Sequence, residues 1–117
     1  MRAGELRHRP VLQVLATVQD DETGEMVARY IDVTKVWAKI EPLSAKDLIA
    51  AQASGSEVSV RVTIRHRKGI TDRHRFVHRD QFLHVQGVLP DADSGRDYLT
   101  LPCSEGVKRW QTGSGST

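Results

Sequence analysis

Apolar and polar residues alternate strictly between residues 57 and 67. The apolar positions are Val58, Val60, Val62 and Ile64, and the polar positions are Ser59, Arg61, Thr63 and Arg65. Because successive side chains of a β-strand point to opposite faces, this pattern predicts a strand with one buried face and one face toward water or a partner. We expect this strand to lie at the centre of the core.

Five further segments have the composition or alternation of strands. They span residues 11–19, 27–41, 73–78, 81–89 and 96–103. Polar turns separate them at residues 20–25, 79–80 and 90–95, and Pro42 closes the second segment because proline cannot donate to a ladder. Strands at this spacing predict a mainly β fold, a small antiparallel β-barrel or sandwich of about six strands.

The chain is long enough for one domain. We expect an N-terminal arm over residues 1–9, a single β domain over 10–104 and a flexible tail over 105–117, in which residues 113–117 resemble a linker.

A short helix is predicted between the second and third strands. Ser44 can cap it, and Asp47 follows three residues later as in a capping box. Good helix formers run from Lys46 to Ala53, and residues 54–56 end the helix. Two turns of helix are marginal in water, so we expect this segment to be mobile until something packs on it.

Charge is distributed unevenly. Four acidic residues cluster within residues 20–25, whereas residues 61–79 carry seven positive charges against one negative charge. Three readings stay open: a solvated strand face, a surface for nucleic acid or an acidic protein, and copies of the chain that meet acidic turn to basic face. The candidate basic residues are Arg7, Arg9, Arg61, Arg65 and Arg67, and the candidate acidic residues are Asp20, Asp21 and Glu22.

The residue types of a catalytic or metal site do not converge in this sequence. Cys103, the only cysteine, follows Leu99 and Leu101 on an apolar strand face, which predicts a buried thiol in a reducing compartment. His74 and His78 lie four positions apart, about 13 Å along a strand, too far to share one metal ion. We therefore expect no enzyme, no cofactor and no metal.

The sequence also argues against a membrane protein. The longest unbroken apolar run covers only residues 48–51, whereas a membrane helix needs about 20 apolar residues. The first ten residues lack the apolar centre of a secretory signal.

Several sequence segments together resemble a known family. These are residues 4–9 (GELRHR), 36–44 (VWAKIEPLS), 51–52 (AQ), 56–58 (SEV) and 64–71 (IRHRKGIT). Their order and spacing, from about residue 2 to 103, are similar to the head–tail joining proteins of tailed bacteriophages and prophages, also called head-closure, stopper or adaptor proteins. One departure is the turn at residues 78–81, where the family often has a glycine.

The resemblance implies a β-barrel-like subunit that assembles into a ring below the portal, closes the DNA-filled head and docks the tail. The implied partners are other copies of the chain, the portal or adaptor protein, a tail-completion protein and the packaged DNA in the channel. The implied location is the virion, after assembly from subunits in the host cytoplasm. The family has no catalytic residues to carry over.

The resemblance also implies a role for residues 44–57. This loop would lie toward the channel or a neighbouring subunit and change conformation on assembly. Its polar residues are Ser44, Lys46, Asp47, Gln52, Ser54, Ser56 and Glu57.

The alternative is a small basic β-barrel that binds nucleic acid directly. Barrels that bind single strands stack bases on aromatic side chains. The outward face of residues 57–67 offers two arginines and no aromatic residue. This absence favours the structural ring over the nucleic-acid module.

Overall fold

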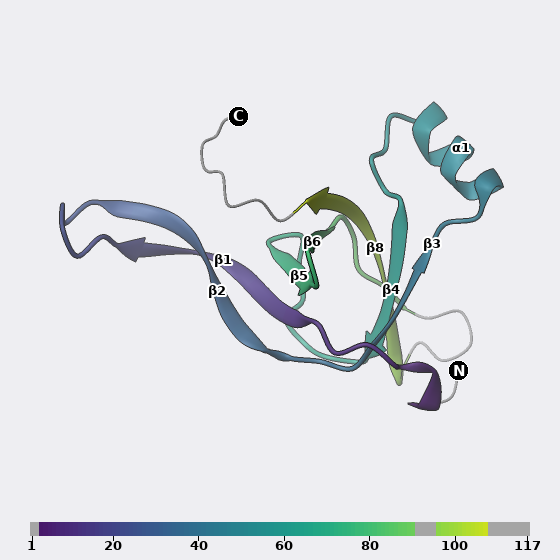
Figure 1. Ribbon diagram of the computed structural model, residues 1–117, viewed down its shortest axis with the longest axis horizontal. Helices are drawn as coiled ribbons and strands as arrows, with labels where there is room; N and C mark the ends of the chain where they lie inside the picture. The colour runs from purple at the N-terminus through teal and green to yellow at the C-terminus, as the bar shows by residue number, and fades with distance from the viewer. Residues whose placement is uncertain (1–2, 91–95, 108–117) are drawn as a thin grey trace.

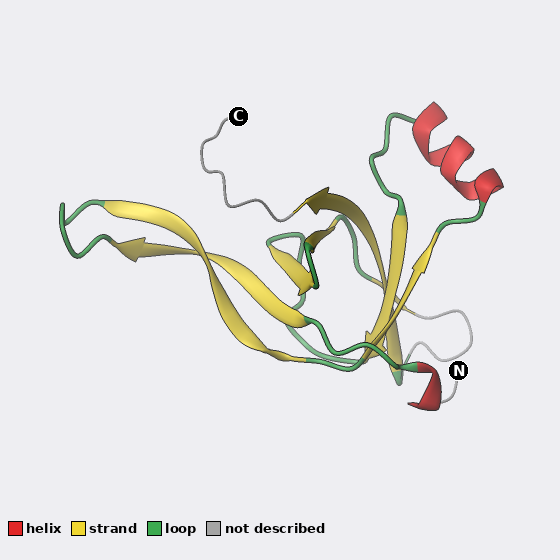
Figure 2. Ribbon diagram, in the orientation of Figure 1, coloured by secondary structure: helices red, strands yellow, loops and turns green. Residues whose placement is uncertain are grey.

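The computed structural model describes residues 3–90 and 96–107. It is mainly β, with one short α-helix and one 3₁₀ turn (Figure 2). The elements in chain order are η1 (Ala3–Glu5), β1 (Val11–Gln19), β2 (Met26–Lys35), β3 (Ala38–Pro42), α1 (Ala45–Ala53), β4 (Val60–Arg65), β5 (His74–His78), β6 (Gln81–Val85), β7 (Leu89–Pro90) and β8 (Tyr98–Val107).

All strands belong to one antiparallel sheet. Its order is β2-β1-β5-β6-β8-β4-β3, and the short β7 pairs with β8. The predicted mainly β, antiparallel fold is confirmed, but the sheet is curved and is not closed into a barrel. A single bridge between His8 and Ala38, with N–H···O distances of 2.9 and 2.7 Å, connects the segment before β1 to the edge strand β3.

Two of the predicted strands are each divided in the structure. Residues 27–41 form β2 and β3, which pair with different strands, β1 and β4, so the chain leaves one edge of the sheet at Val36 and Trp37 and joins the other. Residues 81–89 divide into β6 and the start of β7. These two breaks explain why eight strands replace the six expected.

The last strand is longer than predicted. Residues 98–103 of β8 pair with β4, and residues 103–107 pair with β6. The ladder therefore continues into the segment expected to be a tail. The rest of that segment, residues 108–117, and the predicted turn at 91–95 lie outside the described residues.

The core lies against β4, as the alternation predicts. Val60, Val62 and Ile64 are buried, and Val62 is 0% exposed. Buried partners come from the neighbouring strands: Leu12, Ala38, Phe76, Leu83, Val85, Leu99, Leu101 and Cys103.

The outward face of β4 is only partly exposed. Thr63 was expected to face water or a partner, but it is 2% exposed. It pairs with Lys39 of β3 on one side and Thr100 of β8 on the other. Because β4 has a neighbour on both edges, the short side chain of Thr63 at its centre is covered, whereas Arg65 at its end stays exposed.

The turn between β5 and β6 holds a strained residue. Arg79 and Asp80 form the predicted two-residue loop, and Arg79 has a φ of 54°. A positive φ at the first loop residue only is the pattern of a type II′ turn, in which glycine is favoured. An arginine with a positive φ therefore occupies the position at which this type of turn favours glycine.

The β1–β2 hairpin extends beyond the rest of the sheet. Strand β1 pairs with β5 only from Val11 to Val14, and one further bond joins Leu15 N–H to Arg73 C=O at 2.9 Å. Residues 16–29 therefore form a two-stranded ribbon, which projects from the body in Figure 1. From here on, the arm means this ribbon and not the N-terminal residues 1–9, and the remaining strands are called the body.

Helix α1 also projects from the body, on the loop between β3 and β4 (Figure 1). It has the predicted bounds and cap: Ser44 Oγ accepts a hydrogen bond from Asp47 N–H at 3.2 Å. None of its residues is buried. Across the described residues, no helix has the length and apolar character needed to cross a membrane.

Candidate functional site

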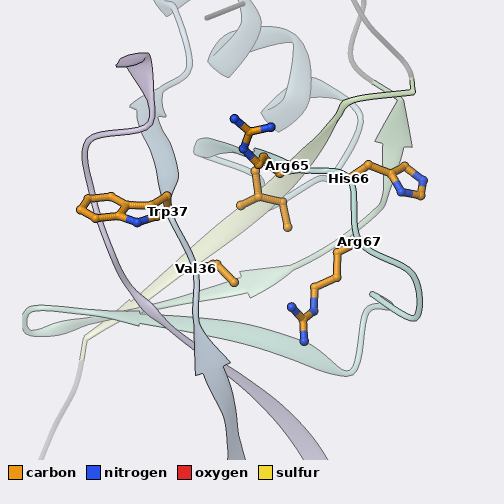
Figure 3. A pocket seen from close by; sticks show the side chains of 6 residues that line it. Val36, Trp37, Arg65, His66 and Arg67 are labelled. Carbon is orange, nitrogen blue, oxygen red and sulfur yellow. The ribbon is translucent and has the colours of Figure 1, made fainter. Parts of the chain in front are cut away.

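A surface hollow with a volume of about 220 Å³ lies where the chain crosses from β2 to β3 (Figure 3). Its lining residues are Val36, Trp37, Ile64, Arg65, His66 and Arg67. The end of β4 places Arg65, and a bond from His66 N–H to Asp97 C=O at 2.7 Å fixes the chain that follows. We call this site the Trp37 hollow.

Trp37 is the apolar wall of this hollow. It is 53% exposed, although tryptophan is among the largest apolar side chains. The Arg9 guanidinium lies 5.4 Å from the centre of its ring, a cation–π contact. The hollow therefore combines an aromatic surface with the positive charges of Arg9, Arg65 and Arg67.

The structure brings three of the five candidate basic residues together. Arg65 and Arg67 line the Trp37 hollow and Arg9 lies over Trp37. Arg61 points elsewhere, with Nη2 3.7 Å from the Asp47 carboxylate of α1. Arg7 lines a separate hollow beside Lys39.

The candidate acidic residues lie at the tip of the arm, where Asp20 is bonded to the backbone of the turn and the other two are exposed. The Asp20 carboxylate accepts N–H bonds from Glu22 at 2.8 Å and Thr23 at 3.3 Å. These bonds, with the nearby Arg29 guanidinium at 3.3 Å, hold the pKa of Asp20 below its usual value. Asp20 therefore shapes the turn. Asp21 and Glu22 are exposed, and in the described part of the chain their carboxylates form no ion pair.

The candidate residues of the 44–57 loop also fall into two groups. Ser44 caps the start of α1, the Ser54 hydroxyl donates to Ala51 C=O at 2.9 Å, and Ser56 Oγ accepts from Val58 N–H at 3.2 Å. These serines shape the loop. Lys46, Gln52 and Glu57 remain exposed.

Reasoning from the sequence missed a stack at the base of the arm. The Arg75 guanidinium lies 3.6 Å from the ring centre of Tyr30 and 3.8 Å from that of Phe82, and Nε donates to Gln13 Oε1 at 2.8 Å. It joins β2, β1, β5 and β6 across one face of the sheet. Only the pairing register brings these four residues together, so no local pattern predicts them.

Trp37, in contrast, could have been predicted from the sequence as a surface residue of the site. It lies on the polar face of the predicted strand, beside Lys39 and Glu41. A tryptophan on the outward face of a strand is typical of a surface that meets a partner.

The reactive residue types are held in structural positions. Burial raises the pKa of the Cys103 thiol to about 12, so the predicted buried thiol is confirmed. Burial lowers the pKa of His74, His78 and His84. Among residues 3–90 and 96–107, no three His, Cys, Asp or Glu side chains are grouped as metal ligands.

Comparison with known protein families identifies the family to which this chain belongs. The sequence matches the family model of the phage head completion protein over residues 1–106. The chain belongs to the phage head completion protein family. This confirms the family resemblance of the sequence and gives the chain a structural role in a phage head.

Two solved structures share the fold. The solution structure of protein SF1141 from Shigella flexneri 2a is 32% identical, with a TM-score of 0.69, and the match covers 93% of this chain and 100% of that one. A chain from the virion of a native gene transfer agent particle is 18% identical, with a TM-score of 0.57, and the match covers 86% and 96%. The second likeness shows the fold alone. No curated protein matches the sequence significantly.

Proposed function

We propose that this head completion protein forms a ring below the portal of a phage or prophage, closes the DNA-filled head and offers a docking surface for the tail. The observation that carries the proposal is the presence of two projections, the arm and α1, on a body that already has its own core. An isolated hairpin and a nine-residue helix are each marginal in water, so both are suited to contacts made on assembly.

The partners in this proposal are other copies of the chain, the portal or adaptor protein, a tail-completion protein and DNA that passes through the channel. Subunits in the host cytoplasm would assemble on the DNA-filled head. A chain of the same fold is part of the gene transfer agent virion, which supports a place in a particle. No catalytic role is proposed.

Helix α1 and its loop would face the channel or a neighbouring subunit and change conformation there. Three features support this: no residue of α1 is buried, Ile49 is 66% exposed, and the ion pair that joins Asp47 of the helix to Arg61 of the body is partly exposed. The loop is therefore held weakly and can take a second position at little cost.

A loop deletion tests the proposal. Replacing residues 45–55 by a short Gly-Ser linker should leave the melting temperature of the body nearly unchanged, because no core residue is removed. In phage particles the variant should join the portal poorly, so that heads package DNA and then leak it. Electron microscopy of particles and of the protein with its portal measures both. Heads that retain DNA and gain tails without the chain would contradict the proposal.

Amide exchange supplies the matching measurement on the unaltered protein. Residues 45–53 should exchange fast in the free subunit and slowly in the assembly, while β4 stays protected in both. Equal protection of α1 in both states would argue against a change on assembly.

One observation favours the alternative, direct nucleic-acid binding. Trp37 is an exposed aromatic ring beside Arg65 and Arg67, at the edge of a strand face that carries no aromatic residue of its own. However, Arg9 covers the ring, and Trp37 is the only aromatic among the exposed large side chains of the described residues. Single-strand binders stack successive bases on several rings.

A binding assay separates the two functions. If the chain binds nucleic acid directly, the isolated subunit binds DNA at micromolar affinity or better, with a steep salt dependence that Arg65→Ala/Arg67→Ala reduces. We expect no such binding. A structural ring instead predicts failed joining to the portal in the same variant.

A further inference from the structure

We propose that the Trp37 hollow of one subunit receives the arm tip of a second copy, residues 20–26. This inference rests on the proposed ring and names the contact that would build it. Both halves of the contact are present on every chain, as a head-to-tail assembly requires.

The hollow is a positive site without an acidic partner. Arg65 and Arg67 line it, Arg9 borders it, and no carboxylate is among its lining residues. The Arg65 guanidinium lies 5.9 Å from the centre of the Tyr98 ring, but among the described residues neither Arg65 nor Arg67 forms an ion pair with a carboxylate. Their charges are thus available to an acidic group from outside the chain.

The arm tip has the complementary chemistry. Asp21, Glu22 and Glu25 are exposed, and Met26 beside them is 63% exposed. The Asp20 carboxylate fixes the turn through its two backbone bonds, so the acidic side chains sit on a preformed tip. Three carboxylates can face three guanidinium groups while the thioether of Met26 packs on the part of the Trp37 side chain that Arg9 leaves open, since this side chain is 53% exposed.

A subunit cannot fill its own hollow. The arm tip lies at one end of the long axis, and the hollow lies in the body where β2 passes into β3 (Figure 1). The paired ladder of β1 and β2, from Gln19–Met26 to Val11–Lys35, separates the two. The tip must therefore reach a different copy. Such a contact between unlike faces closes into a ring or continues as a filament.

Charge and apolar surface together favour a second copy over DNA as the occupant. The phosphates of duplex DNA would pair with the arginines, but its bases are stacked inside the duplex and offer nothing like Met26 to the exposed ring. Single-stranded DNA could stack a base there, but single-strand binders use several rings, and Trp37 is the one aromatic residue among the described residues that line the hollow. The arm, for its part, carries four acidic residues within six positions and would be repelled by DNA.

Cysteine cross-linking tests the contact in assembled particles. Cys103 is buried, so the unaltered chain provides a clean background. A chain with both Thr23→Cys at the tip and His66→Cys at the hollow should give a ladder of multimers with a short bis-maleimide. Each single variant should stay monomeric, because the tip of one copy faces the hollow of the next. Pairing Thr23→Cys with Ile49→Cys on α1 is the matched control and should give no ladder.

The outcomes separate this inference from the proposed function. Absence of the chain from particles would overturn the ring and the contact together. A chain that enters particles yet gives no ladder would overturn the contact alone, as would dimers from Thr23→Cys by itself. If nuclease treatment were needed to expose His66→Cys to maleimide, DNA would be the occupant and the contact would be wrong.

A charge exchange gives a second test that does not depend on cross-linking. Arg65→Glu/Arg67→Glu and Asp21→Lys/Glu22→Lys should each lower the yield of completed particles by roughly tenfold or more, because like charges would meet. Combining all four changes should restore most of that loss. Arg73→Glu/Arg79→Glu, with the same charge change at exposed residues outside both the hollow and the α1 loop, should have little effect. Failure of the combined variant to recover would overturn the pairing.

Discussion

Strands β4 and β2 belong to the same sheet but differ in almost every physical respect. Strand β4 has neighbours on both edges and buries Val60, Val62 and Ile64. Strand β2 is the edge strand, and of its ten residues eight are exposed, Met26 and Ile31 among them. Paired ladders and buried side chains stabilise the first, whereas an edge that stays open is a place for another chain to pair or pack.

The same contrast separates the body from its two projections. In the body, burial and hydrogen bonding determine which residues are tolerated. In the arm and α1, the described side chains contribute little to the core, so their sequences are free to serve contacts with other chains. Stability therefore resides in the body, and the proposed function assigns the assembly contacts to the projections.

The largest effect on stability is expected from a buried charge in the body, whereas the same change in the projection α1 should have little effect. Val62→Asp places an unpaired charge at a position that is 0% exposed, which costs several kcal/mol of a total stability of about 5–15 kcal/mol. Ile49→Asp makes the same kind of change on α1, where the side chain is 66% exposed, and should cost less than about 0.5 kcal/mol. Urea denaturation measures both. A folded Val62→Asp protein with unchanged melting would show that the register of β4 is wrong.

A smaller effect is expected from pH, again in the body. Burial lowers the pKa of His74, His78 and His84 below the ordinary 6.5, and all three lie in β5 and β6. The unfolded chain then takes up protons more readily than the folded chain, so this stability is fully present above about pH 6.5 and is lost as the pH falls below it.

Melting curves between about pH 8 and pH 5 check this expectation. The melting temperature should be constant at the upper end and fall below about pH 6.5, and the fall should be shallower in His78→Gln/His84→Gln. A melting temperature that rises on acidification would contradict the burial of these side chains.

The sequence predicts the body far better than the surfaces. Alternation at residues 57–67 is a local signal that identifies β4 and its buried face, and Pro42 is a separate local signal that marks the end of β3. The capping signal at Ser44 and Asp47 likewise identifies α1. The register of Gln13, Arg75 and His84 is not local, because it depends on which strands pair.

The site shows the same limit. The sequence offers five basic residues as candidates for an interface with protein or DNA, and the structure does not bring them all together, because Arg61 lies against Asp47 and Arg7 lines a separate hollow. Whether a charged side chain points to a neighbour or away depends on where β2 leaves the sheet, at Trp37. A pattern read as one strand from 27 to 41 contains no sign of that crossing.

A still smaller effect is expected from residues with a positive φ in two of the turns, one in the body and one in the arm. Arg79→Gly relieves a left-handed residue between β5 and β6 and should gain about 0.5 kcal/mol after the added freedom of the unfolded chain is counted. Gly24→Ala creates such a residue in the arm, where φ is 75°, and should cost about 1 kcal/mol there. Because the arm lies outside the core, the loss should appear as faster exchange in residues 16–29 and not as a lower midpoint for the body. Equal shifts of the body midpoint would show that arm and body unfold as one unit.

The smallest effect concerns the ion pair between body and projection. Arg61 Nη2 lies 3.7 Å from the Asp47 carboxylate, and the two side chains are 42% and 54% exposed. Exposed pairs of this kind contribute about 0–1 kcal/mol and weaken in salt. Arg61→Ala should therefore change the free energy of unfolding by no more than a few tenths of a kcal/mol. Arg65→Ala, on the same strand, is the control: it removes the same charge and a contact with the Tyr98 ring, but no ion pair among the described residues. The two variants should differ in α1, where only Arg61→Ala speeds amide exchange. If Arg61→Ala instead lowers the stability of β4 itself, the helix supports the body, and the division between a stable body and free projections does not hold.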